Sequence, residues 1–417
     1  MIDLSLSAMA PPLPRLRSDL DFMPSPLREQ PGLLVRDPFR YSTTTLVIPP
    51  LLARCLGCFD GEQDEGDLRA TLARLSGQVD VGEAVRHLVT ALHDAGFLHD
   101  DRYAELREAK ERDFAALPAR SPAHAGNGYP SDAPALAAWS RGFFHGEAAP
   151  AALAGANGGV LGVAAPHVSP DGGRASYAAA YRAIPPSHAE RVFVVLGTSH
   201  YGEPDRFGLT RKPFVTPFGE ARTETALVDE LAQAAPGAVA IEDYCHAVEH
   251  SVEFQIVFLQ HLFGPQVRIL PILCGAFIEG PRVGRPPETN DGVARFVGAL
   301  GELAARERGR LSFVLGVDFA HIGRRYGDPR AARAHEGALV EVAARDRARL
   351  SRIEAGDGAG FWDLVMERGE DDLRWCGSSP LFTFLRAVPD ARGRALAYEH
   401  WNIDEASVVS FGAVAFS

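Results

Sequence analysis

The chain of 417 residues is longer than one ordinary hydrophobic core, so two domains are expected. A formal net charge of −12 and the lack of a Lys/Arg-rich run argue against nucleic acid as a partner. Five cysteines are an odd and sparse count for a secreted disulfide framework. The sequence contains neither a signal peptide nor an apolar run long enough to span a membrane, so we expect a cytoplasmic protein without a membrane partner.

The first part of the chain divides into an arm and a small domain. Residues 1–37 hold many prolines and little periodicity, which predicts an extended arm. Residues 38–115 then read as a strand near 41–48, an apolar helix near 51–61, amphipathic helices at 67–75 and 82–95, and a short β ending at 97–98. This order predicts a small winged-helix-like α+β domain.

Two short segments of this domain resemble a known module. Phe59-Asp-Gly-Glu62 and Leu92-His-Asp-Ala-Gly-Phe-Leu98 are similar to the peptide-recognition domain of the pyrroloquinoline quinone biosynthesis D type, which implies a peptide or protein partner. The acidic residues between 62 and 67 argue against DNA. The Cys55-x-x-Cys58 pair could bind a metal or cycle its redox state, but it lacks a second Cys or His pair at ligand spacing. We interpret both thiols as buried structural side chains.

Residues 119–417 alternate apolar strands with helices, which predicts an α/β domain whose mostly parallel sheet is sandwiched by helices. Three of the predicted strands end in chemically active side chains. His167 follows the run that starts at Gly162, His200 ends the run from Val192, and Asp318 with His321 follows the run from Leu311. Open α/β sheets bind ligands at the carboxyl ends of their strands, so these residues are the first candidates for a site.

Asp318 and His321 are three residues apart and form the predicted catalytic pair. His321 could act as acid or base toward a bound substrate, because imidazole titrates near neutral pH. Asp318 could orient a metal-ligating histidine. The alternative is that both belong to a hydrogen-bond network within a loop.

Two further segments carry candidate residues. Glu249-His-Ser-Val-Glu253 is predicted to open a helix, so Glu249 and Glu253 at i and i+4 would share one face and His250 would point elsewhere. The alternative explanation is that both acids complement the helix dipole. Cys376 precedes another helix, whose N-terminus would lower the pKa of the thiol and favour a metal-binding thiolate; a buried core cysteine is the alternative.

Six ordered motifs in residues 119–417 resemble the Memo family, system protein B of the AmmeMemoRadiSam set, which is similar in fold to the class III extradiol dioxygenases that use non-haem iron. The motifs are His124-Ala-Gly-x-x-Tyr129, Ala165-Pro-His167, Gly197-x-Ser-His200, Glu249-His-Ser-x-Glu253, Asp318-Phe-x-His321 and Cys376-Gly377. One position departs from the pattern, because this chain has Gln255 where the family often has a histidine.

The resemblance implies a metal pocket built from His167, His200 and Cys376. It implies iron as the favoured metal, with copper or zinc as alternatives, since two imidazoles and a thiolate suit all three. It also implies radical SAM and AMMECR1-like partner proteins. The residues expected to bind substrate are His124, Tyr129, Glu249, His250 and Glu253.

Two functions from different classes follow from these expectations. The first is a mononuclear metal-dependent oxidoreductase, dioxygenase-like, that acts on a phenolic or otherwise electron-rich small molecule or peptide. The second is a non-catalytic metal-binding or adaptor protein that holds a peptide or partner in the same pocket.

Overall fold

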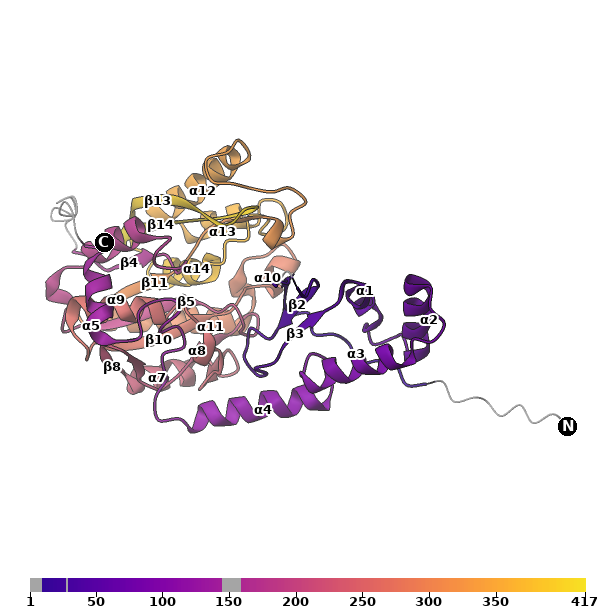
Figure 1. The fold of residues 1–417 in the computed structure, drawn as a ribbon. Helices are drawn as coiled ribbons and strands as arrows, with labels where there is room; N and C mark the ends of the chain where they lie inside the picture. The colour runs from indigo at the N-terminus through magenta and orange to yellow at the C-terminus, as the bar shows by residue number, and fades with distance from the viewer. Residues whose placement is uncertain (1–9, 28, 145–158) are drawn as a thin grey trace. The chain divides into compact units, whose positions relative to one another are not determined.

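The computed structural model describes residues 10–27, 29–144 and 159–417. The chain forms two compact units, residues 1–116 and residues 117–417, which Figure 1 shows from indigo at the N-terminus to yellow at the C-terminus. Each unit has its own hydrophobic core. Among the described residues, no helix combines the length and hydropathy needed to cross a membrane.

In residues 10–27 and 29–116, the N-terminal unit pairs a small sheet with four α-helices. The sheet is antiparallel in the order β1 (Asp21–Pro24), β2 (Leu33–Arg36), β3 (Thr45–Ile48). The helices are α1 (Pro50–Ala53), α2 (Glu65–Ser76), α3 (Gly82–Asp94) and α4 (Asp101–Ala116). A reciprocal capping box between Asp64 and Asp67 begins helix α2. The helix is terminated by Gly77, whose φ of 71° lies in the left-handed region that glycine adopts without strain.

The prediction of an extended arm over residues 1–37 does not hold for the segment that contains β1 and β2. Arg17 is fully buried, and its guanidinium donates to both carboxylate oxygens of Asp37 at 3.1 and 3.2 Å and to the carbonyl of Gly96 at 3.1 Å. It also lies 4.2 Å from the centroid of the Tyr103 ring. The sequence did not reveal the pairing of β1 with β2, because each strand has only four residues and its alternation of apolar and polar side chains is too short to detect.

The predicted apolar helix over 51–61 is also shorter than expected. It divides into α1 and a 3-10 turn at Leu56–Cys58. Cys55 and Cys58 are both buried free thiols in the core of this unit. Their burial among apolar side chains agrees with the structural interpretation of the pair.

In the described part of the larger unit, eleven strands form one sheet, with the main order β12-β14-β4-β11-β5-β10-β6-β9. The central strands β4, β11, β5 and β10 run parallel, and β14 and β6 flank them antiparallel. The strand bounds are β4 (Gly162–Ala165), β5 (Val192–Thr198), β6 (Phe207–Leu209), β7 (Phe214–Thr216), β8 (Gly219–Thr223), β9 (Val239–Ile241), β10 (Arg268–Cys274), β11 (Leu311–Gly316), β12 (His321–Gly323), β13 (Gly393–Asp404) and β14 (Ser407–Phe416).

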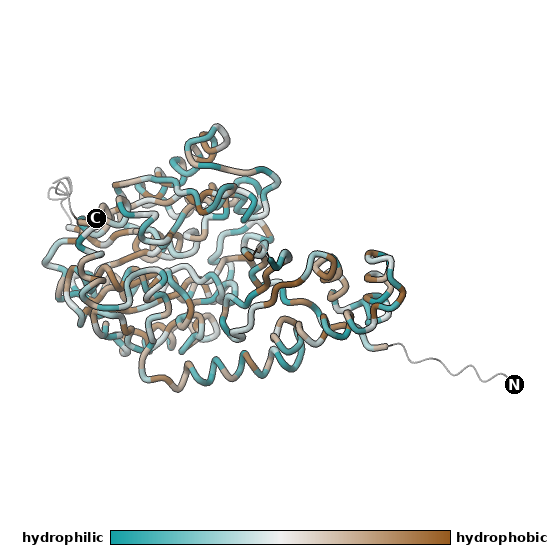
Figure 2. The backbone as a smooth tube through the Cα atoms, viewed as in Figure 1, coloured by the Kyte–Doolittle hydropathy of each residue, from teal (hydrophilic) through white to brown (hydrophobic). Residues whose placement is uncertain are grey.

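Helices cover both faces of this sheet, because successive side chains of β5 belong alternately to two different core clusters. Val192, Val194 and Leu196 belong to one core cluster, whereas Phe193 and Val195 belong to the other. The first cluster is completed by α7 (Thr225–Ala234), α11 (Asp291–Arg306), α12 (Ala338–Glu354), α13 (Gly358–Val365) and α14 (Ser378–Ala387). The second is completed by α6 (Arg174–Arg182) and α9 (Glu253–Phe263), near α5 (Ala133–Arg141). Figure 2 shows the resulting hydrophobic interior in brown.

A buried ion pair fixes the segment that opens the larger unit. Arg120 and Glu253 are fully buried and form a salt bridge. Arg120 also donates through Nε to the carbonyl of His246 at 2.8 Å and through Nη2 to that of Glu249 at 2.9 Å. Loss of one partner of a buried pair leaves an uncompensated charge, which costs about 3–5 kcal/mol.

We therefore expect residues 117–417, expressed alone, to unfold cooperatively, and residues 131–417 to be less stable by about 3–5 kcal/mol, because the shorter fragment lacks Arg120. Urea unfolding followed by circular dichroism measures the difference. Equal stability of the two fragments would contradict the structural role of the ion pair.

Candidate metal centre

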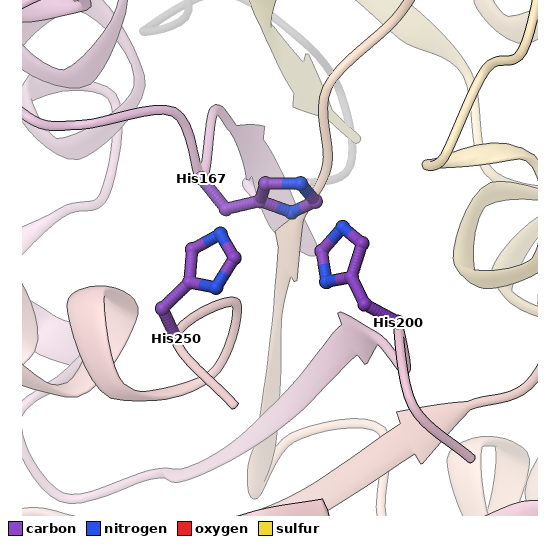
Figure 3. Close-up of side chains that lie close together, drawn as sticks. All are labelled: His167, His200 and His250. Atoms are coloured by element: carbon purple, nitrogen blue, oxygen red, sulfur yellow. The ribbon is translucent and has the colours of Figure 1, made fainter. Parts of the chain in front are cut away.

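Three imidazoles converge at the carboxyl edge of the parallel strands. His167 follows β4, His200 follows β5, and His250 lies in the break between α8 (Cys245–Val248) and α9. One ring nitrogen from each lies within 4.8 Å of the others. Figure 3 shows the three rings facing one another. The β4 and β5 ends meet because β11 pairs in parallel with both strands.

Glu249 determines how two of these rings are oriented. Its buried carboxylate lies 3.0 Å from Nδ1 of His200 and 3.0 Å from Nδ1 of His250. A carboxylate accepts hydrogen bonds, so both Nδ1 atoms carry a hydrogen and both Nε2 atoms face away from Glu249. Each Nε2 can bind a metal ion once its ring is neutral, so metal binding releases the Nε2 proton of a charged ring. The same carboxylate also accepts from the backbone N–H groups of His200 at 2.9 Å and His250 at 2.8 Å.

The charges of this group depend on one another. Burial alone would lower the pKa of His200, but the Glu249 carboxylate outweighs it and holds that pKa well above its ordinary value. Burial alone would raise the pKa of Glu249, but the His200 charge and the hydrogen bonds from both rings hold it well below. Burial, together with repulsion from His200 and His250, holds the pKa of His167 well below its ordinary value. His167 is therefore a neutral imidazole, as a metal ligand must be.

His167 is fixed through its other nitrogen in the same way. Nδ1 donates to the carbonyl of Gly316 at 2.9 Å, at the end of β11, so Nε2 carries the lone pair. That Nε2 lies 3.2 Å from Sγ of Cys376 and 3.5 Å from Oδ2 of Asp318. The other Asp318 oxygen accepts from the backbone N–H of His167 at 3.0 Å.

Cys376 lies beside the three histidines, just before α14. Its carbonyl accepts a hydrogen bond from Oγ1 of Thr198 at 2.9 Å, which ties the turn to the end of β5. The expectation that the helix N-terminus lowers the pKa of this thiol is wrong, because burial raises it despite the opposing contact with His200. Without a bound metal ion, the thiol would therefore be favoured over the thiolate.

His321 begins β12 and has a fixed tautomer. Its Nδ1 donates to the carbonyls of Phe319 at 2.9 Å and Arg374 at 3.0 Å, which leaves Nε2 as an acceptor. Burial and repulsion from the positive His200 lower its pKa to about 4. Burial raises the pKa of Asp318 to about 6, against the hydrogen bonds from the backbone of His167 and Val168.

Sequence reasoning missed Tyr326, which lies beside His321, and assigned no contacts to Gln255. The ring of Tyr326 packs edge-on against His321 at 4.9 Å between centroids, and burial raises the pKa of its hydroxyl, with contributions from Cys376 and Asp318. Gln255 is fully buried: its amide donates to the carbonyl of Pro166 at 3.0 Å and accepts from the Tyr181 hydroxyl at 2.7 Å. Only its departure from the family pattern singled Gln255 out in the sequence.

The predicted helix from Glu249 to Glu253 is broken, so these two acids do not share a helix face. Glu249 has extended backbone at the end of α8, and α9 begins at Glu253. The break turns the Glu249 carboxylate and the His250 ring toward the same group of histidines. The sequence suggested a helix because both acids fit its first turn.

Glu253 stabilises the loop that carries His124 and Tyr129. Its carboxylate accepts hydrogen bonds from the backbone of Ala123 at 3.1 Å and His124 at 3.0 Å, from the Tyr129 hydroxyl, and from Arg120. His124 donates through Nε2 to the carbonyl of Val248 at 2.9 Å, and its ring packs edge-on against His250. These contacts orient the His250 segment.

Another buried carboxylate, that of Asp346 on α12, joins the segments that carry Cys376 and His321. Asp346 accepts from Nε1 of Trp375 at 2.7 Å, from the Tyr398 hydroxyl at 2.7 Å and from Oγ of Ser410 at 2.6 Å. Ser410 in turn accepts the backbone N–H of Ala320 at 2.9 Å. Asp346 thus holds the residues adjacent to both Cys376 and His321.

The donor set fits a metal ion. Three imidazoles have their Nδ1 hydrogens engaged by a carboxylate or a carbonyl, and a thiol lies within contact distance of one of them. This combination of nitrogen and sulfur donors is characteristic of transition-metal sites. His250, which was expected to bind substrate, thus becomes a candidate metal ligand. The only sequence signal that could have pointed to this role is the adjacent Glu249, which can orient an imidazole.

The family model of the Memo-like protein matches residues 120–415. The chain belongs to the Memo family. A MEMO1 family protein of Aquifex aeolicus is 25% identical over 299 residues, which cover 72% of this chain and 74% of that protein. A MEMO1 family protein of Thermus thermophilus is 28% identical over 253 residues, which cover 59% and 68%.

Other similarities are shorter or more distant. A MEMO1 family protein of Thermococcus kodakarensis is 32% identical over 162 residues, 37% of this chain and 51% of that protein. The match to the crystal structure of an uncharacterized Escherichia coli K12 protein covers 54% of this chain and 86% of that protein's chain. Its TM-score is 0.33 and the sequence identity is 13%.

Glu249→Gln should weaken the binding of Zn(II) about 10–100-fold. The amide carries no negative charge, so it holds the Nδ1–H groups of the two imidazoles less strongly than the carboxylate does. Competition with a chromophoric chelator measures the affinity. Glu203→Gln, at an exposed carboxylate close to His200 in the sequence, is the control and should bind as the unmodified protein does. Equal losses in both variants would contradict the role of Glu249.

Asp346→Asn should lower the free energy of unfolding by about 1–3 kcal/mol, because the amide replaces one acceptor oxygen with a donor that faces two hydroxyl groups. Urea denaturation measures this change. Glu341→Gln, an exposed position on the same helix, should leave stability within about 0.5 kcal/mol. A similar loss in both variants would contradict the bracing role of Asp346.

Proposed function

We propose that this Memo protein is a mononuclear metal-dependent oxidoreductase whose metal is held by His167, His200 and His250, with Cys376 as a fourth ligand. The observation that carries the proposal is the convergence of three imidazoles whose Nδ1 hydrogens are already engaged. Iron is the favoured ion, and copper or zinc are the alternatives. When bound, a redox metal would supply Lewis acidity and electron transfer for oxidation of a phenolic substrate.

The residues of the chain would bind and deprotonate that substrate. His321 is neutral at pH 7 because its pKa is about 4, so its Nε2 lone pair would accept a hydrogen bond from the phenolic hydroxyl. It would take the proton where the Lewis acidity of a bound metal ion lowers the pKa of the phenol. Its Nδ1–H, held by two carbonyls, keeps this tautomer during the transfer. Asp318 would hold the backbone of His167 and keep that ligand in place. Tyr326, packed against His321, would shield the proton acceptor from water.

The proposal extends to the rest of the chain. The fold of the larger unit is taken to be of the extradiol-dioxygenase type, and the N-terminal unit a winged-helix-like module that recruits a peptide or protein. Radical SAM and AMMECR1-like proteins are the proposed partners, and the cytoplasm the proposed compartment. The second candidate, a non-catalytic adaptor that binds a peptide in the same pocket, is favoured if the metal-loaded protein consumes no oxygen.

The ligand set is tested by Co(II) substitution. We expect His167→Ala, His200→Ala and His250→Ala each to lower Co(II) affinity at least tenfold. Cys376→Ser should abolish the thiolate-to-cobalt charge-transfer band. Cys55→Ser combined with Cys58→Ser, in the other unit, should leave both readings unchanged. Full affinity in His250→Ala would remove His250 from the ligand set, and a retained band in Cys376→Ser would remove the thiol.

The reaction class is tested with anaerobically purified protein loaded with Fe(II). Oxygen uptake should follow addition of catechol and be reduced at least 100-fold in His321→Ala, with the iron content unchanged. Tyr326→Phe keeps the ring beside His321 and should keep most of the activity. If His321→Ala lost its iron, His321 would be part of the metal site and not the proton acceptor.

A further inference from the structure

A cleft of about 650 Å³ opens beside the candidate metal centre. Residues from the ends of β5 and β10, from α10 (Glu279–Arg282), from α13 and from the start of α14 line it. His200 and Cys376 belong to this lining as well as to the metal centre, so the cleft reaches the metal centre at these two residues. The volume is within the range of ordinary small-molecule sites.

The walls of this cleft are mainly aromatic and apolar. Phe277, Trp362 and Trp375 line it with 6%, 5% and 2% of their surfaces exposed, so their positions are set by the core. The rings of Phe277 and Trp362 lie 5.9 Å apart between centroids. Met366 adds a polarizable thioether, which makes favourable contacts with aromatic rings. Ile278 completes the apolar lining from the opposite segment.

The walls are also held in place. Trp375 is fixed by the hydrogen bond of its Nε1 to Asp346, and its ring stacks on Phe319 at 4.2 Å. Trp362 packs edge-on against Phe382 of α14 at 5.0 Å. The cavity is thus formed before a ligand enters, and binding needs little rearrangement of these side chains. Two charged lining residues, Arg282 and Glu370, are exposed to solvent.

We propose that this cleft binds the apolar tail of a small aromatic substrate whose phenolic head lies at the histidines. The inference rests on the proposed function, because the head is placed by the metal centre. A preformed aromatic cleft that shares two lining residues with the candidate ligands selects an elongated, neutral aromatic molecule over a compact phenol. A small molecule suits a concave cleft of this volume, lined by segments of a single unit, better than an extended peptide does.

The test compares 4-phenylphenol with phenol, which has the same head and no tail. Isothermal titration of the full-length protein should give a dissociation constant for 4-phenylphenol at least about tenfold lower than for phenol, because the second ring buries apolar surface. Met366→Trp and Ile278→Trp, both at partly exposed lining positions, should reduce this preference below about threefold by filling the cleft. Val340→Trp, at an exposed position of α12, should preserve it.

Titrations of both the Zn(II)-loaded and the chelator-treated protein separate this inference from the proposed function. A tail preference that is sensitive to the two cleft variants in both forms supports the cleft even if Fe(II) protein consumes no oxygen. A preference that is absent, or that survives both cleft variants when each unfolds like the unmodified protein, overturns the inference. A tyrosine-containing tetrapeptide that displaces 4-phenylphenol with higher affinity would overturn the small-molecule assignment.

Discussion

The arrangement of the site depends on one buried carboxylate shared by two imidazoles. Glu249 accepts Nδ1–H from both His200 and His250 at 3.0 Å. A buried carboxylate is costly without partners, and an imidazole in this position has no defined tautomer without the carboxylate. The three groups therefore stabilise one another only when the end of β5 meets the break between α8 and α9. This requirement links the parallel sheet directly to the chemistry of the pocket.

Other buried polar groups perform the same task for the remaining segments. Glu253 with Arg120 fixes the loop that packs against His250, and Asp346 joins the neighbours of Cys376 and His321. Each of these acids is nearly or fully buried, so each loses most of its solvation and is satisfied by several partners. The site is thus surrounded by satisfied polar networks that restrict where its loops can lie.

Gln255 illustrates how this chain differs from the pattern that its family resemblance implied. The position where a histidine was expected carries an amide that donates to Pro166 and accepts from Tyr181. An amide can do both at once and remains neutral at every pH. It therefore fixes the turn before His167 without adding another ionisable group beside the three histidines.

The sequence by itself determined the α/β class of the larger unit, the strand-end positions of His167 and His200, and membership of the Memo family through six ordered motifs. The α/β class and the strand-end positions follow from local periodicity and from residue types at the ends of strands, whereas the family follows from the resemblance of the six motifs. Only the tertiary structure decided that His250 joins the histidines, that β1 and β2 form a sheet, and that burial raises the pKa of Cys376. The physical reason is that ring orientation, strand pairing and desolvation arise from contacts between segments distant in the chain, which no local pattern encodes.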